Sequence, residues 1–112
     1  MSRPKVYDFA PLPKKVTAIV RAVCADYDRR ARALRGNTID EAVRANYCRL
    51  NTVVDLALAA VEEPMIRAEI LRDMIAGRGY ERSRARPYLC DRAYYRRRRM
   101  VLFGVAKRLD LC

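Results

Sequence analysis

The chain has 112 residues, of which 52% are apolar, and its formal net charge is +11. This length suits one domain with a modest core, and this apolar share excludes a disordered polyelectrolyte. A charge of this size favours negatively charged partners, with nucleic acid first among them.

The positive charge is concentrated in the last third of the sequence. Residues 78–112 carry eleven Lys or Arg and three acids, a net charge of +8. Residues 1–77 carry thirteen basic and ten acidic residues, a net charge of only +3. We therefore expect a surface that binds anions to be built from the C-terminal part.

Residues 1–13 contain three prolines and predict an extended N-terminal arm. Apolar residues recur at three- and four-residue steps over residues 14–35, which predicts an amphipathic helix. Gly36-Asn37 is typical of a helix C-terminus. Thr38 and Glu41 have the spacing of a capping box, so we expect a second helix over residues 38–61.

Pro64 is suited to the first turn of a third helix, predicted over residues 64–76, and Gly77-Arg78-Gly79 should end it. Residues 80–90 predict at most a short helix, because Pro87 disfavours helical conformation before it. The last helix is predicted over residues 92–109 with Asp91 as its N-cap.

Within this last helix, Tyr95 lies in line with Leu102, with Val105 or Ala106, and with Leu109, so we expect Tyr95 to be the ring in the core and Tyr94 to be exposed. Gly104 is either a weak point in the helix or a place where another helix comes close. The sequence as a whole predicts an all-α fold, a compact helical domain of four to five helices spanning residues 14–112. Residues 14–63 form a long helical hairpin and residues 64–112 a helix-turn-helix-like part in this interpretation.

Residue types common in enzymes are scarce. The chain has no histidine, and its four cysteines form no Cys-x-x-Cys pair, so we expect no enzyme, no metal site and no cofactor. No segment resembles a signal peptide, and no apolar run approaches the ~20 residues that span a bilayer. We therefore expect a soluble, intracellular protein with reduced thiols and no membrane partner.

The basic start of the last helix is the strongest functional signal. Arg92, Arg96 and Arg99 share one side of a helix, and arginines pair bidentately with guanine edges or with phosphate. A recognition helix that enters the major groove presents such groups near its N-terminus. The predicted DNA-binding residues are Arg84, Arg86, Arg92, Tyr94, Arg96, Arg97, Arg98 and Arg99.

This C-terminal part resembles the phage and prophage transcriptional regulators of the ArpU/RinA type. In that family a phrase close to Ile-Ser-x-x-Thr-Tyr-Tyr opens the recognition helix of a helix-turn-helix similar to region four of sigma factors. Here Leu89-Cys90-Asp91 stands at the turn, Ala93-Tyr94-Tyr95 opens the helix, and Leu102, Ala106 and Leu109 approximate its tail. The first helix of the unit would be residues 80–87 or, alternatively, residues 65–76.

The resemblance implies a phage-encoded regulator in the cytoplasm of a bacterial host. It would bind double-stranded promoter DNA and contact host RNA polymerase. Two other functions use the same arginines and stay open: a small phage module that inhibits a host protein through its acidic surface, and a DNA-packaging accessory protein that forms a ring. The apolar faces of helices 14–35 and 38–61 would also support a homodimer.

Overall fold

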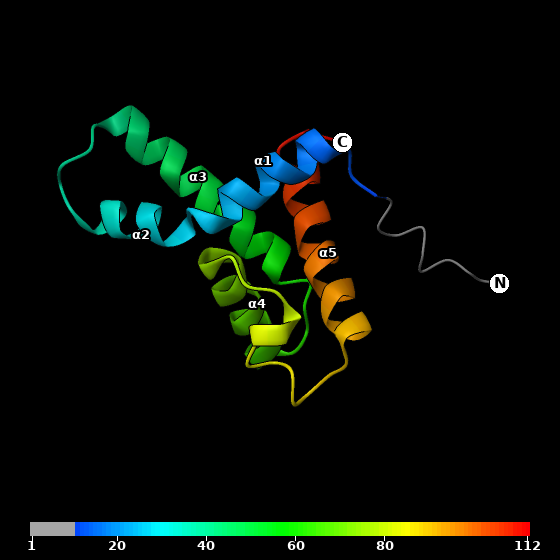
Figure 1. Cartoon of the computed structure of the whole chain (residues 1–112). Coiled ribbons are helices and arrows are strands. Elements are labelled where there is room, and N and C mark those ends of the chain that lie inside the picture. The colour runs from blue at the N-terminus through cyan, green and yellow to red at the C-terminus, as the bar shows by residue number, and fades with distance from the viewer. Residues whose placement is uncertain (1–10) are drawn as a thin grey trace.

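The computed structural model describes residues 11–112, and every regular element in that range is helical (Figure 1). The predicted all-α fold is confirmed. Residues 11–13 have no regular secondary structure, and residues 1–10 of the predicted arm lie outside the described residues. The elements are α1 (Lys14–Ala25), α2 (Tyr27–Arg35), α3 (Glu41–Leu58), α4 (Pro64–Ala76), the 3-10 helix η2 (Tyr80–Arg82) and α5 (Asp91–Arg108).

The helix predicted over residues 14–35 is interrupted at Asp26, where the prediction of one continuous helix was wrong. Asp26 has φ −90° and ψ 5°, and α2 begins at the next residue. The Arg30 side chain, only 2% exposed, donates to the Val23 carbonyl, which in a regular helix would accept from the amide four residues later. Arg30 Nε also donates to Oδ1 of Asn51 on α3, at 2.7 Å. Arg30 thus bonds to α1 through the Val23 carbonyl and to α3 through Asn51, and these bonds stabilise the break between α1 and α2.

The start of α3 also differs from the prediction. The N-cap is Asp40, whose Oδ1 accepts from the Val43 amide at 2.9 Å, so Thr38 is not the cap and the helix does not begin at residue 38. The helix ends at Leu58, short of the predicted residue 61. Val61 follows in the connection to α4 and is 1% exposed, so this connection still contributes to the core.

The predicted signals at both ends of α4 are confirmed. Pro64 occupies the first turn, where its missing amide leaves no bond unmade. Gly77 ends the helix with φ +71°, the left-handed conformation that glycine adopts without steric cost.

The core lies where α5 crosses α3 and α1, with α4 packed against α1. A β-carbon on Gly104 of α5 would lie 3.1 Å from Cβ of Ala57 on α3. The two helices therefore approach closely at this point, as one of the two interpretations of Gly104 predicted. The apolar residues that are at most 1% exposed are Val20, Cys24, Val54, Ala57, Val61, Ile70, Ala85, Tyr94, Val101, Val105 and Ala106.

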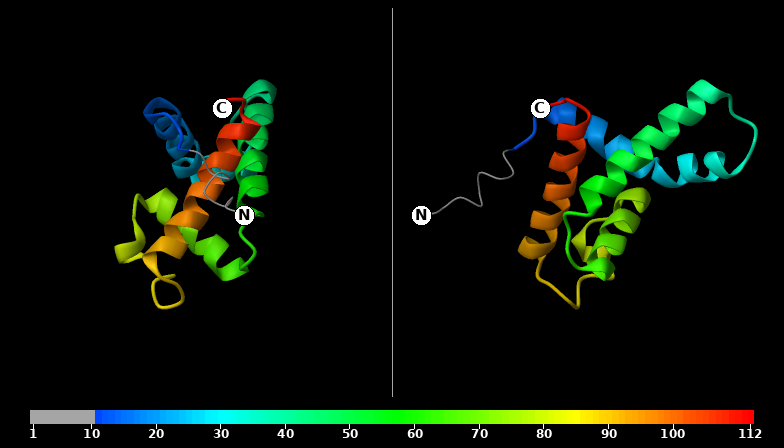
Figure 2. Two further views of the ribbon diagram at one scale, coloured as in Figure 1. Left: turned by 90° about the vertical axis from the view of Figure 1, so that its right-hand side faces the viewer. Right: turned by 180° about the vertical axis from the view of Figure 1, so that it is seen from behind.

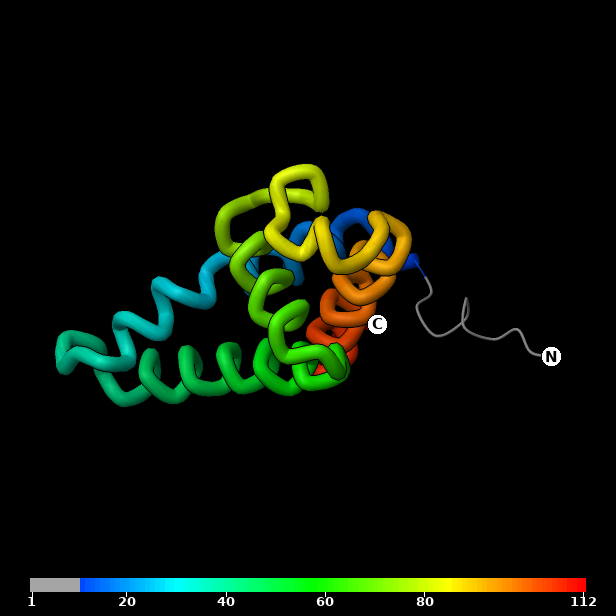
Figure 3. The backbone as a smooth tube through the Cα atoms, turned by 90° about the horizontal axis from the view of Figure 1, so that it is seen from below, coloured from blue at the N-terminus to red at the C-terminus, as the bar shows by residue number. Residues whose placement is uncertain are grey.

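The α2 helix and the first half of α3 form a hairpin that projects from the body made by α1, α4 and α5 (Figures 2 and 3). Polar contacts hold its two helices together. Arg44 of α3 donates to the Leu34 and Gly36 carbonyls at the end of α2, at 2.9 and 2.7 Å. Tyr27 donates to Asp55 at 2.7 Å.

Residues 77–90 connect α4 to α5 and contain η2 as their only regular element. The Tyr80 hydroxyl lies 2.8 Å from the Leu89 carbonyl and 3.2 Å from the Arg86 carbonyl, so it closes this segment on itself. Ser83 Oγ accepts from the Ala85 amide at 3.0 Å. The connection is longer than the three- or four-residue turn typical of a helix-turn-helix.

Candidate nucleic-acid interface

The eight predicted DNA-binding residues fall into three groups in the structure. Tyr94 is fully buried, Arg97 and Arg98 are half-buried and bonded to other parts of the chain, and the remaining arginines are exposed. The exposed members are Arg84, Arg86, Arg92, Arg96 and Arg99.

The two adjacent tyrosines have exchanged their predicted roles. Tyr94 is 0% exposed and Tyr95 is 37% exposed, so Tyr94 is the ring in the core and cannot contact DNA in this fold. The Tyr94 hydroxyl donates to Oδ2 of Asp73 on α4 at 2.7 Å. Burial and this hydrogen bond raise the pKa of Tyr94 to about 12, which keeps the hydroxyl protonated as a donor.

Arg97 pairs with Glu63, the residue just before α4. Its Nε and Nη2 donate to the two carboxylate oxygens at 3.1 and 2.8 Å, a bidentate arrangement. This hydrogen bond from Arg97 holds the pKa of Glu63 below its usual range. Arg97 therefore links α5 to the start of α4, and its guanidinium is already partly neutralised.

Arg98 has a structural role as well. Its Nη1 donates to the Arg78 carbonyl in the segment after α4 and to the Tyr94 hydroxyl, the latter at 2.9 Å. Arg78 in turn donates through Nε to Oδ1 of Asp73 at 3.2 Å. Asp73, Arg78, Tyr94 and Arg98 thus form one network, which we call the Asp73 network. It fixes the first turns of α5 to α4 and to the turn that follows α4.

Three exposed arginines in the first half of α5 form a stripe along one side of the helix. Arg92, Arg96 and Arg99 follow one another at steps of four and three, and Lys107 continues the line. The buried positions Val101 and Val105 lie on the other side. We call Arg92, Arg96 and Arg99 the α5 basic stripe.

Two further arginines lie in the segment before α5. Arg84 and Arg86 are both exposed, and the guanidinium of Arg86 lies 5.9 Å from the centre of the Tyr80 ring. Arg96 of the stripe shares a surface hollow with Glu62 and Glu63, so this end of the stripe borders the acidic start of α4.

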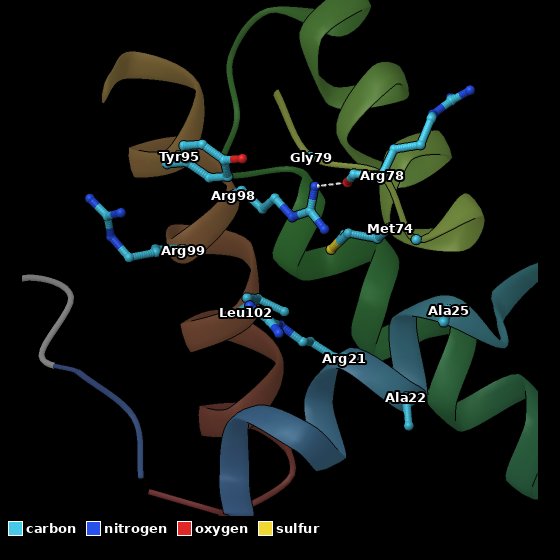
Figure 4. Close-up of a pocket in the computed structure, with 11 residues that line it drawn as sticks. Arg21, Ala22, Ala25, Met74, Arg78, Gly79, Tyr95, Arg98, Arg99 and Leu102 are labelled. Carbon is cyan, nitrogen blue, oxygen red and sulfur yellow. Dashed lines mark hydrogen bonds between the residues drawn. The ribbon is translucent and has the colours of Figure 1, made fainter. Parts of the chain in front are cut away.

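A pocket that the sequence did not predict opens between α1, α5 and the turn after α4 (Figure 4). It has a volume of about 500 Å³. Arg98 extends across it toward the Arg78 carbonyl, and Arg21 extends from α1 toward Leu102 (Figure 4). Sequence periodicity showed only that Arg21 lies away from the apolar side of its helix, because its neighbours on α5 are distant in the chain.

The described residues contain no cluster typical of a metal site and no helix able to cross a membrane. Within residues 11–112 there is no group of three acidic or cysteine side chains that could hold a metal ion. None of the helices over the same range is both long and apolar enough to span a bilayer. Cys24 is buried, which raises its thiol pKa to about 11, while Cys48, Cys90 and Cys112 are exposed.

Comparison with family models, with curated proteins and with solved structures found no match to this chain. Whether this chain binds nucleic acid is therefore judged from the chemistry of the surface described above.

Proposed function

We propose that the protein binds double-stranded DNA through the α5 basic stripe and the arginines of the preceding segment, and that it regulates transcription. The observation that carries the proposal is the exposure of five arginines, three on α5 and two in the segment before it, in a part of the chain with net charge +8. The regulatory role rests on the resemblance to regulators of the ArpU/RinA type.

The physical argument begins with the charge around α5. Residues 78–112 carry eleven basic side chains and only three acids, so the acids of this segment cannot neutralise most of its positive charge. Among the described residues, Arg92 and Arg99 have no hydrogen-bond or ion-pair partner. Duplex DNA offers a regular row of phosphates, and each phosphate neutralised by Lys or Arg releases a bound counterion.

The geometry of α5 suits insertion of this helix into the major groove of DNA. Its stripe is exposed, and the N-cap residue Cys90 makes no side-chain bond to the first-turn amides. The positive end of the helix dipole adds to the charge of Arg92 at this point. Asp91, predicted as the N-cap, is instead the first residue of the helix and lies in the same turn.

The proposal predicts duplex binding that weakens steeply as salt rises. Fluorescence anisotropy with a labelled mixed-sequence duplex of about 25 base pairs would measure the affinity between 50 and 300 mM salt. Three to five phosphate contacts give a slope of log K against log salt between about −3 and −5. If the full chain binds no duplex at 50 mM salt, the proposal is wrong.

A further inference from the structure

We infer that the pocket between α1 and α5 is a phosphate-binding site, with Arg21 and Arg98 as its main ligands and Arg99 at its rim. The existence of this site does not depend on the proposed function. The further statement, that the phosphate belongs to bound DNA, does rest on the proposed function. Arg21 lies on α1, outside every segment so far assigned to DNA binding.

The charge of the pocket is the first argument. Its lining includes Arg21, Arg78, Arg98 and Arg99 but no acidic residue. Arg78 is neutralised by Asp73, with Nη2 3.1 Å from Oδ1. Arg21 and Arg99 have no partner among the described residues, and Arg98 uses only Nη1 in its described bonds. An anion would relieve the repulsion between these guanidinium groups.

The direction of the donors is the second argument. Arg21 enters the pocket from α1 and Arg98 enters it from α5, whereas Arg99 extends away from both at the rim (Figure 4). A tetrahedral phosphate presents oxygens to donors arriving from several sides, whereas a planar carboxylate best fits a single fork. Arginine is the residue best suited to such contacts.

The Tyr95 hydroxyl gives the pocket a neutral donor. It accepts from the Tyr80 amide at 3.0 Å, and its own proton has no acceptor among the described residues. A hydroxyl can accept one hydrogen bond and donate another, so this proton is available to a phosphate oxygen. The small side chains Ala22 and Ala25 on α1 leave the pocket open on that side.

The test uses inorganic phosphate as the probe and Arg21→Gln as the variant. Arg21 is exposed, so this change should leave the fold intact. The matched control is Arg32→Gln on α2, which removes the same charge from an exposed arginine with no partner among the described residues. Thermal unfolding is followed as phosphate rises at constant ionic strength, with sodium chloride making up the balance.

We expect phosphate to raise Tm of the wild-type chain and of Arg32→Gln in a saturable manner. Arg21→Gln should bind phosphate about tenfold more weakly, the change expected for one charge-assisted hydrogen bond. Phosphate also stabilises proteins by exclusion from their surface, without any site. Equal stabilisation of the wild-type chain and Arg21→Gln would show only that effect and would overturn the inference.

Duplex DNA identifies the source of the phosphate. If DNA supplies it, Arg21→Gln lowers the salt slope of duplex binding by about 0.9, whereas Arg32→Gln leaves the slope unchanged. If Arg21→Gln loses the stabilisation by phosphate but keeps the wild-type salt slope of duplex binding, the ligand of the pocket is a free phosphate compound and not DNA. If the wild-type chain binds no duplex but phosphate stabilises it through Arg21, the proposed function fails and the pocket stands.

Discussion

Replacing Asp73 with alanine should lower the free energy of unfolding by about 3 kcal/mol. Asp73 is 0% exposed and accepts from Tyr94 and Arg78. Its removal leaves a buried hydroxyl and a partly buried guanidinium without their acceptor. Breaking a buried charge pair costs about 3–5 kcal/mol, and the partial exposure of Arg78 places the loss at the lower end.

Chemical denaturation of Asp73→Ala, Asp73→Asn and Asp28→Ala measures this effect. Asp73→Asn retains an oxygen that can accept from Tyr94, so its loss should be smaller than that of the alanine variant. Asp28 is exposed, and Asp28→Ala should stay within about 0.5 kcal/mol of the wild-type chain. An Asp73→Ala chain within 1 kcal/mol of wild type would contradict the role assigned to the Asp73 network.

Replacing the three arginines of the α5 basic stripe with glutamine should weaken duplex binding by about 100-fold at fixed salt. Arg92, Arg96 and Arg99 are all exposed, so the fold should survive the change. If each contributes about 1 kcal/mol to DNA contact, the combined loss is about 3 kcal/mol.

The matched control for this triple variant changes Arg32, Arg35 and Arg49 to glutamine. These arginines are exposed and lie on the α2–α3 hairpin, so the net charge falls equally while α5 is untouched. Anisotropy with the same duplex should show a small loss for the control and the large loss for the stripe variant. Equal losses in the two variants would mean that net charge alone, and not the stripe, determines binding.

Most of the helices were predicted from the spacing of apolar residues and from the residues that begin or end a helix, because both signals act over a few neighbouring residues. Pro64 and Gly77 bound α4 as expected, since both effects arise from the backbone of a single residue. The break at Asp26 had no such signal. It depends on Arg30 reaching Asn51 on another helix, and a contact of this kind leaves no mark on local periodicity.

The sequence pattern of α5 allows either Tyr94 or Tyr95 to be the ring in the core. Tyr94 lies in line with Val101 and Val105, and Tyr95 lies in line with Leu102 and Ala106, so both faces are apolar. Tyr94 has a carboxylate partner, Asp73, which comes from α4 and was not visible in the pattern of α5. A buried tyrosine usually needs a partner for its hydroxyl, and that partner decided which ring entered the core.

Only the part of the candidate site that depends on local spacing along one helix was predicted from the sequence. The stripe follows from the spacing of arginines on one helix. The engagement of Arg97 with Glu63 and of Arg98 with the Arg78 carbonyl depends on how α5 meets α4. The contribution of Arg21 depends on the packing of α1 against α5. Sequence therefore indicated which helix carries the charge, and tertiary structure determines which charges remain available.

Mapping the bound duplex onto the chain tests the central claim most directly. Amide resonances of the ¹⁵N-labelled protein, followed during titration with a duplex, report which residues change environment. The account predicts shifts concentrated in residues 77–90 and the first turns of α5, with little change in the hairpin of α2 and α3. Shifts concentrated in that hairpin, or no shifts at low salt, would contradict DNA binding through the α5 basic stripe.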